Sequence, residues 1–113
     1  MNDNKIYEKL KEFNIPVFSG RASEAEITKL KGYHYFVITK GKLYEKDCHL
    51  YRNILVHYIF ENAQSISDVE IIDKLKGPGF KFDGMVPDEV RLGDSDRFVE
   101  INTFTFKRPE RYE

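Results

Sequence analysis

The most reactive side chains in this sequence are three histidines and a single cysteine. His34, His49 and His57 are candidate metal ligands, but none has a partner at the spacing that zinc sites use. Cys48 and His49 are adjacent, and adjacent side chains in a strand point to opposite faces. A nucleophilic Cys48 would need a base and an oxyanion site, and its loop suggests neither. We therefore predict no metal site and no catalytic cysteine, and we interpret His57 as a packed or interface residue.

A second group with potential chemistry consists of carboxylates in the C-terminal third of the chain. These residues are Asp83, Asp88, Glu89, Asp94 and Asp96. Their spacing matches no EF-hand, and Asp and Gly are common in hairpin turns for conformational reasons alone. The interpretation we favour is therefore turn chemistry rather than a calcium loop or a catalytic carboxylate pair.

The glycine-rich stretch GPGF, Gly77 to Phe80, follows a predicted helix instead of preceding one. A phosphate loop requires a helix N-terminus, so no nucleotide site is expected here. With no site for a nucleophile, metal or cofactor in the sequence, we expect that the protein is not an enzyme and uses no cofactor.

Length and composition indicate one domain, residues 1–113. A chain of 113 residues is long enough to fold around its own core. Seven Tyr and nine Phe with no Trp favour strands, and one cysteine allows no internal disulfide, which points to a reducing, intracellular setting. The N-terminus has no signal-peptide pattern, and no apolar run approaches the roughly 18 residues of a membrane span. A net charge of -1 does not suggest an electrostatic grip on nucleic acid.

Two segments have the patterns of helices. Ile6, Leu10 and Phe13 form one apolar stripe, and Pro16 follows it. A second helix is indicated by the capping box of Ser67 with the glutamate three residues later, and a Gly-Pro pair ends it. Residues 24–31 are predicted to form either a short helix or a loop.

The strand candidates are rich in aromatic and β-branched residues. They are Gly32 to Thr39, Tyr51 to Glu61, an extended stretch that is broken near Pro87, and two strands joined by a turn at Gly93 to Asp96, of which the second is Phe98 to Phe106. The polar tail, residues 108–113, is expected to be frayed. The resulting order is α, β, β, α, β, β.

Both faces of the last strand look occupied. In FVEINTFTF one face carries Phe98, Glu100, Asn102, Phe104 and Phe106, and the other carries Val99, Ile101, Thr103 and Thr105. The strand Tyr51 to Glu61 is also apolar on both faces. Two helices cover only one face of such a sheet, and an uncovered apolar face usually marks an interaction surface. The alternative is that the loops Gly20 to Gly32 and Gly84 to Leu92 fold over it.

The order of segments resembles that of the tail terminator, or tail-completion, proteins of long-tailed bacteriophages and prophages. The stretches that carry the resemblance are IPVFSGRA, YHYFVITKG, YRNILVHYIFE, ISDVEIIDKLKG, GFKF and RFVEINTFTFKR. Together they cover nearly the whole chain, as a pattern without a diagnostic motif. The chain departs from the family in its charged loop from Ser23 to Lys31 and in His34, which stands where a proline is typical.

The resemblance implies an α+β fold, with two main helices packed on one face of a mostly antiparallel, four- to five-stranded sheet. It also implies a structural role: a self-associated ring, usually six-fold, that caps the tail tube and docks it to the head connector or head-closure protein. Such a protein binds no small-molecule substrate and no membrane. It works in the host cytoplasm during assembly and ends in the neck of the virion.

For association we expect the uncovered sheet face and the charged loop to make the contacts. The expected interface residues are Phe98, Phe104, Phe106, His57, Tyr58 and Arg21. The first alternative is another neck component such as a head-closure protein. A second is a nucleic-acid module that stacks bases on Phe104 and Phe106, although Glu100 on the same face and the near-neutral charge argue against it. A small enzyme comes last.

Overall fold

The computed structural model describes residues 3–20, 33–61, 64–77, 79–94 and 96–110, and these residues form two helices and a five-stranded sheet. The elements are α1 Asp3–Lys11, β1 Val17–Ser19, β2 His34–Lys46, β3 His49–Glu61, α3 Asp68–Leu75, β4 Lys81–Arg91 and β5 Phe98–Glu110. The expected helix 24–31, the charged loop and Arg21 lie outside the described residues.

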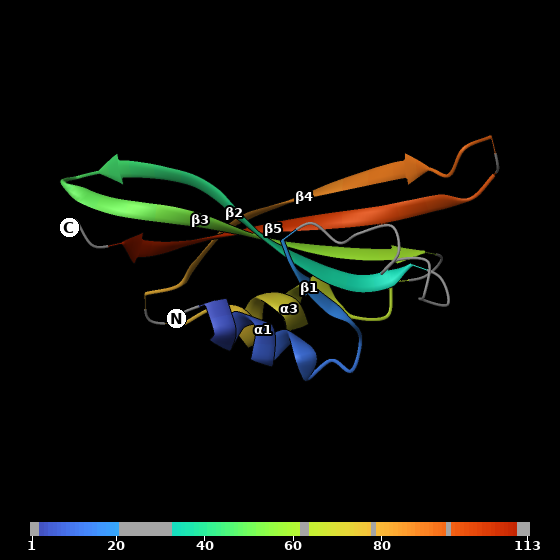
Figure 1. Cartoon of the computed structure of the whole chain (residues 1–113), viewed down its shortest axis with the longest axis horizontal. Coiled ribbons are helices and arrows are strands. Elements are labelled where there is room, and N and C mark those ends of the chain that lie inside the picture. Colours follow the sequence, from blue (N-terminus) through green and yellow to red (C-terminus); the bar gives the residue numbers. More distant parts are fainter. Residues whose placement is uncertain (1–2, 21–32, 62–63, 78, 95, 111–113) are drawn as a thin grey trace.

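The sheet is mixed and mostly antiparallel, with strand order β1-β2-β3-β5-β4. Only the short β1 pairs in parallel, with β2, and the other three pairings are antiparallel. The predicted α+β class is therefore confirmed, with five strands. In Figure 1 the β2–β3 hairpin extends toward one end of the molecule and the β4–β5 hairpin toward the other.

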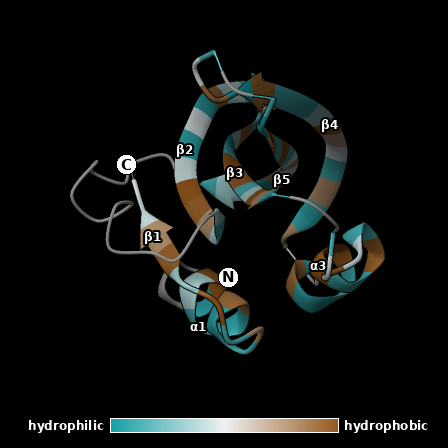
Figure 2. Cartoon of the chain, turned by 90° about the vertical axis from the view of Figure 1, so that its right-hand side faces the viewer, coloured by the Kyte–Doolittle hydropathy of each residue, from teal (hydrophilic) through white to brown (hydrophobic). Residues whose placement is uncertain are grey.

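Both helices lie on the same side of the sheet, as Figures 1 and 2 show. Their apolar stripes are fully buried at Ile6 and Leu10 of α1 and at Ile71 and Leu75 of α3. The predicted cap of α3 is confirmed, since the Ser67 hydroxyl accepts a hydrogen bond from the Glu70 backbone N–H at 3.2 Å.

Aromatic rings from the sheet fill the space beneath the helices. The largest fully buried side chains are Tyr58, Phe36, Phe80, Phe104 and Phe106. The rings of Phe80 and Phe106 are stacked almost in parallel, with centroids 4.9 Å apart and planes at 6°. The face with the helices is therefore a continuous aromatic core.

The β2–β3 hairpin is longer than the sequence suggested. The predicted strands stopped at Thr39 and resumed at Tyr51, whereas the ladder continues to a two-residue turn. Its residues, Asp47 and Cys48, both have positive φ, 53° and 63°. Two such residues give the twist that a tight hairpin requires, so the intervening polar residues extend the strands.

Pro87 does not break the chain, contrary to the prediction. It lies within β4, opposite Asn102 of β5. Because β4 is at the edge of the sheet and pairs only with β5, a residue without an N–H is tolerated on its outer side. The irregularity lies earlier, between Phe82 and Met85, where the register shifts.

The C-terminal tail is also more ordered than expected. Residues 108–110 belong to β5 and pair with the start of β3, where Arg108 lies opposite Arg52 and Glu110 lies opposite Leu50. The predicted fraying is therefore wrong for these three residues, while 111–113 lie outside the described residues.

Candidate interaction site

Three of the expected interface residues lie in the core. Tyr58, Phe104 and Phe106 have no solvent-exposed surface and pack beneath α1 and α3. The helices cover the phenylalanine-bearing face, so in this fold a neighbouring subunit cannot reach these side chains. The expectation that these three side chains make contacts between subunits is therefore wrong, because they belong to the core.

The buried Tyr58 hydroxyl is satisfied within the chain. Nε2 of His34 lies 2.8 Å from it, and the Ser65 hydroxyl oxygen lies 3.4 Å from it and 3.1 Å from the same Nε2. His34, the first residue of β2, thus lies within hydrogen-bond distance of a hydroxyl in the core.

Among the expected interface residues that the structure describes, Phe98 remains accessible. It lies at the start of β5, where the β4–β5 hairpin passes beyond the helices, and it is 44% exposed. It belongs to the same sheet face as Phe104, but neither α1 nor α3 lies over this end. It is therefore retained as a candidate contact residue.

His57 lies on the sheet face turned away from the helices, which we call the open face. Its Nε2 lies 3.0 Å from the Thr39 hydroxyl and its Nδ1 lies 2.9 Å from the Thr103 hydroxyl. A neutral imidazole donates from one nitrogen and accepts at the other, and threonine fits either role. Burial lowers the pKa of His57. The ring is thus a neutral cross-strand link, which leaves no nitrogen free to act as a base.

The open face also carries a small apolar cluster. Tyr35, Ile59 and Val99 are buried there, and they pack with the partly buried Phe18, Tyr33, Val37, Leu92 and Ile101. Phe18 meets the Tyr35 ring edge-on at a centroid distance of 5.6 Å. Strands β3 and β5 thus carry apolar side chains on both faces for two reasons. One face packs in the core beneath the helices, and the other packs in this cluster.

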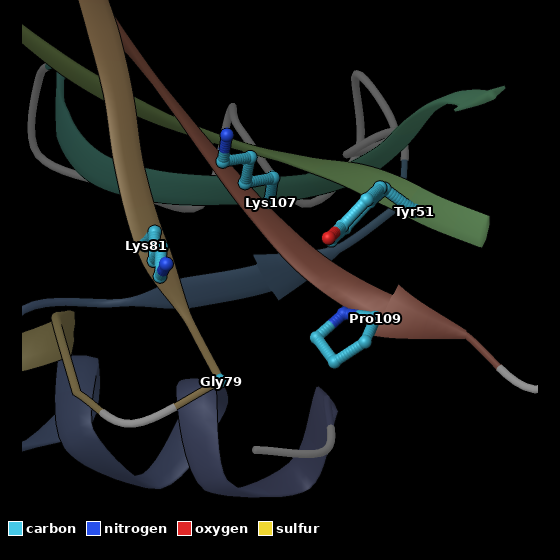
Figure 3. A pocket seen from close by; sticks show the side chains of 5 residues that line it. All are labelled: Tyr51, Gly79, Lys81, Lys107 and Pro109. Atoms are coloured by element: carbon cyan, nitrogen blue, oxygen red, sulfur yellow. The ribbon is translucent and has the colours of Figure 1, made fainter. Parts of the chain in front are cut away.

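A cavity of about 320 Å³ lies at the end of the sheet formed by the β2–β3 hairpin, the start of β4 and the end of β5. It is lined by Tyr51, Gly79, Lys81, Lys107 and Pro109 (Figure 3). Lys81 and Lys107 are directly opposed on the open face, because their neighbours Phe82 and Phe106 pair on the core face. We call them the lysine pair. The Lys107 ammonium lies 5.9 Å from the centre of the Tyr51 ring.

A second cavity, also of about 320 Å³, lies at the opposite end of the β4–β5 ladder. It is lined by Glu61, Glu89, Asp96, Arg97, Phe98 and Glu100. Glu89 and Glu100 are directly opposed across the ladder, and we call them the glutamate pair. Like charges placed opposite one another destabilise a sheet, so both pairs are unfavourable in the isolated chain.

One carboxylate of this second cavity is neutralised internally. Arg97 donates two hydrogen bonds to the Glu61 carboxylate, from Nε at 2.7 Å and from Nη2 at 2.8 Å. The hydrogen bond from Arg97 lowers the pKa of Glu61. The pair ties β3 to the segment before β5, which holds Phe98 next to the glutamate pair.

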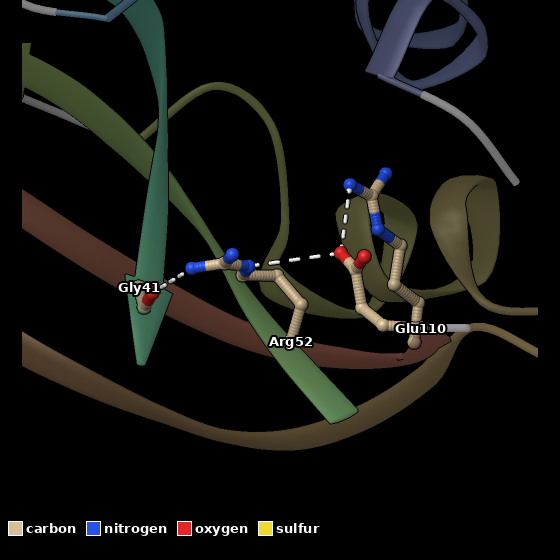
Figure 4. A network of polar contacts seen from close by, with 4 residues as sticks. Gly41, Arg52 and Glu110 are labelled. Carbon is tan, nitrogen blue, oxygen red and sulfur yellow. Dashed lines mark hydrogen bonds and ion pairs between the residues drawn. The ribbon is translucent and has the colours of Figure 1, made fainter. Parts of the chain in front are cut away.

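A polar network ties the β2–β3 hairpin to the end of β5 (Figure 4). Arg52 donates from Nη1 to the Gly41 carbonyl at 3.3 Å, and its Nε lies 3.6 Å from Glu110 Oε1. Arg108 donates from Nη2 to the same carboxylate oxygen at 3.4 Å. These contacts explain why residues 108–110 continue the strand, and their role is structural.

The side chains that the sequence offered as candidates for metal binding or catalysis do not form a common site in the described part of the structure. Among the described residues no group of three His, Cys, Asp or Glu side chains is arranged to hold a metal. Cys48 is exposed in the hairpin turn, and Asp88 and Glu89 lie in β4 rather than in a turn. Over the same part of the chain, no helix is long and apolar enough to cross a membrane.

The two like-charge pairs are the functional candidates that sequence reasoning missed. Glu89 and Glu100 were considered separately, and neither pair is visible without the strand register. Comparison with known proteins supplies no assignment: no protein-family model matches the chain, and no curated protein sequence matches it.

Proposed function

We propose that this protein is a structural tail terminator, or tail-completion, protein of a bacteriophage or prophage. It caps the tail tube as a self-associated ring and docks the tube to the head connector. Two lines support the proposal: the order of segments resembles this family, and the chain has the α+β architecture that the resemblance implies, with both helices on one face of the sheet.

The observation that carries the proposal is the extension of the sheet past its helices at both ends. The molecule measures 49 × 27 × 26 Å, and its two hairpins form the two ends of the long axis (Figure 1). Each end carries a different accessible surface, the lysine pair at one and the glutamate pair with Phe98 at the other. A subunit with two different contact surfaces suits head-to-tail association, which closes into a ring when the rotation permits.

The proposed partners are other copies of the chain, the tail-tube protein and the connector or head-closure protein. Assembly takes place in the host cytoplasm, and the finished ring remains in the neck of the virion. Catalysis has no part in this role.

The test is reconstitution on tail tubes that lack their terminator. The purified protein is added to such tubes, and electron microscopy is expected to show a ring at one end and joining to filled heads. Protein that neither binds tube ends nor supports joining contradicts the proposal.

A head-closure protein is the alternative within the same assembly, and the same experiment separates the two. A head-closure protein binds the connector of filled heads without binding free tube ends. The nucleic-acid alternative is weakened, because the two rings expected to stack on bases, Phe104 and Phe106, are buried.

A further inference from the structure

We propose that a second copy of this chain docks head to tail through the two like-charge pairs, so that the lysine pair and Tyr51 of one copy receive the glutamate pair and Phe98 of the next. The inference rests on the self-association in the proposed function and deepens it by naming the surfaces that meet.

The first argument is that neither pair has a partner of opposite charge among the described residues. Lys81 opposes Lys107 and Glu89 opposes Glu100 across the same β4–β5 ladder. None of the four side chains forms an ion pair with another residue in the part of the chain that the structure describes. Opposed like charges are unfavourable in a sheet, and meeting the opposite pair on a neighbour relieves both repulsions at once.

The second argument is the charge around each pair. The end with the lysine pair also carries Lys40, Lys42, Lys46, Arg52 and Arg108 against Glu45, Asp47, Asp83 and Glu110. The end with the glutamate pair also carries Glu61, Asp88, Asp94 and Asp96 against Arg91 and Arg97. A net charge of -1 for the whole chain thus conceals a basic end and an acidic end, which are complementary to each other.

The third argument is that each end offers an aromatic residue beside its charges. Phe98 is 44% exposed and lines the acidic cavity, while Tyr51 and Pro109 line the basic cavity. Protein interfaces commonly combine a central aromatic contact with a charged rim. Phe98 of one copy therefore packs against Tyr51 and Pro109 of the next.

Geometry excludes pairing within one copy. Lys107 and Glu100 are seven residues apart on β5, which is about 23 Å of strand, and they point to opposite faces. On β4 the register shift between Phe82 and Met85 produces the same reversal of face. The two surfaces thus lie on opposite faces of the sheet and at opposite ends of the molecule. In the proposed contact, one end of each copy therefore overlaps the opposite end of the next copy.

The experiment uses two charge-reversed proteins. One carries Lys81→Glu with Lys107→Glu, and the other carries Glu89→Lys with Glu100→Lys. Each alone carries two pairs of the same charge, so each is expected to sediment as a monomer at a concentration and low ionic strength at which the unaltered chain associates. Mixed in equal amounts they present complementary ends, and association is expected to return.

The matched control for Glu89→Lys with Glu100→Lys is Glu8→Lys with Asp73→Lys, which makes the same charge change at exposed positions of α1 and α3. It is expected to associate like the unaltered chain. Carbodiimide, which joins an amine directly to a carboxylate, adds a second readout in the unaltered chain. Cross-linked dimers should yield peptides that join Lys81 or Lys107 to Glu89 or Glu100, and within one copy these groups are too far apart to react.

Three results overturn the inference: reversed proteins that associate like the control, dimers without these cross-linked peptides, or an unaltered chain that stays monomeric at low salt. A lysine-pair variant that loses binding to a single-stranded oligonucleotide while it still associates would assign the basic end to nucleic acid, and this too overturns the inference.

Failure of this inference leaves the proposed function standing if the reversed proteins still cap tail tubes. Conversely, head-to-tail association without tube binding supports the inference and refutes the proposed function.

Discussion

The hydroxyl of Tyr58 lies 2.8 Å from Nε2 of His34, at the edge of a core in which the tyrosine has no exposed surface. The His34→Ala variant leaves that hydroxyl with only the longer contact to Ser65, and an underpaired buried hydroxyl costs roughly 1–3 kcal/mol. In a Tyr58→Phe background the same change should cost clearly less, since no hydroxyl remains to be satisfied. Urea unfolding of the four proteins measures this, and equal costs in both backgrounds would show that the contact contributes nothing.

Phe104 should be essential for folding rather than for association. Phe104→Ala is expected to lower the free energy of unfolding by about 3–5 kcal/mol, because it leaves a cavity beneath the helices. Phe104→Asp should prevent folding. Phe98→Ala is the matched control, since its side chain is 44% exposed, and it should change stability by less than about 1 kcal/mol. Circular dichroism, recorded as denaturant is added, measures the stability of each variant. A fully stable Phe104→Ala protein would contradict the placement of this face in the core.

The turn at Asp47 and Cys48 should be improved by glycine. Cys48 has φ 63°, a left-handed conformation that is unfavourable for a residue with a Cβ, and Asp-Gly is a preferred pair for a two-residue hairpin turn. Cys48→Gly is therefore expected to raise the free energy of unfolding by about 0.5–1 kcal/mol. Cys48→Ala keeps the strain and should leave stability nearly unchanged. Thermal and urea unfolding of both variants measure the difference. If both substitutions change stability equally, the left-handed backbone at Cys48 is not a source of strain.

Acid should destabilise the protein in part through His57. Burial lowers its pKa in the folded chain below the ordinary value of 6.5, so below that pH the unfolded chain binds the proton more readily. Stability contributed by the neutral ring is thus present above about pH 6.5 and is lost as the pH falls toward the folded pKa. His57→Gln, which keeps a donor and an acceptor for Thr39 and Thr103, should unfold with a shallower dependence on pH between 7 and 5. An unchanged pH dependence would mean that His57 ionises equally in both states.

Local patterns in the sequence were sufficient to predict the two helices that the structure describes and the main strands. The box of Ser67 and Glu70 acts within one turn of chain, so its geometry follows from those residues alone. Likewise the aromatic and β-branched segments predicted strands wherever they occur. These features need no information about distant contacts.

The ends of the strands and the accessible face of the sheet depend on contacts between residues far apart in the sequence. The predictions made from the sequence were therefore wrong about them. Pro87 breaks a central strand but not an edge strand, and only the strand order places β4 at the edge. Residues 108–110 look like a polar tail, yet pairing with β3 and the contacts of Arg52 and Glu110 hold them in the sheet.

The amino-acid sequence by itself determined that the last strand has two apolar faces, because side chains alternate in every strand. Only the tertiary structure decided which face is the core: both helices pack over Phe104 and Phe106, which leaves His57, Thr103 and the lysine pair on the open face. The like-charge pairs depend on tertiary structure as well, since Lys81 meets Lys107 and Glu89 meets Glu100 only through the register of β4 on β5 and its one irregularity. Register is a property of two strands together, so neither strand's sequence contains it alone.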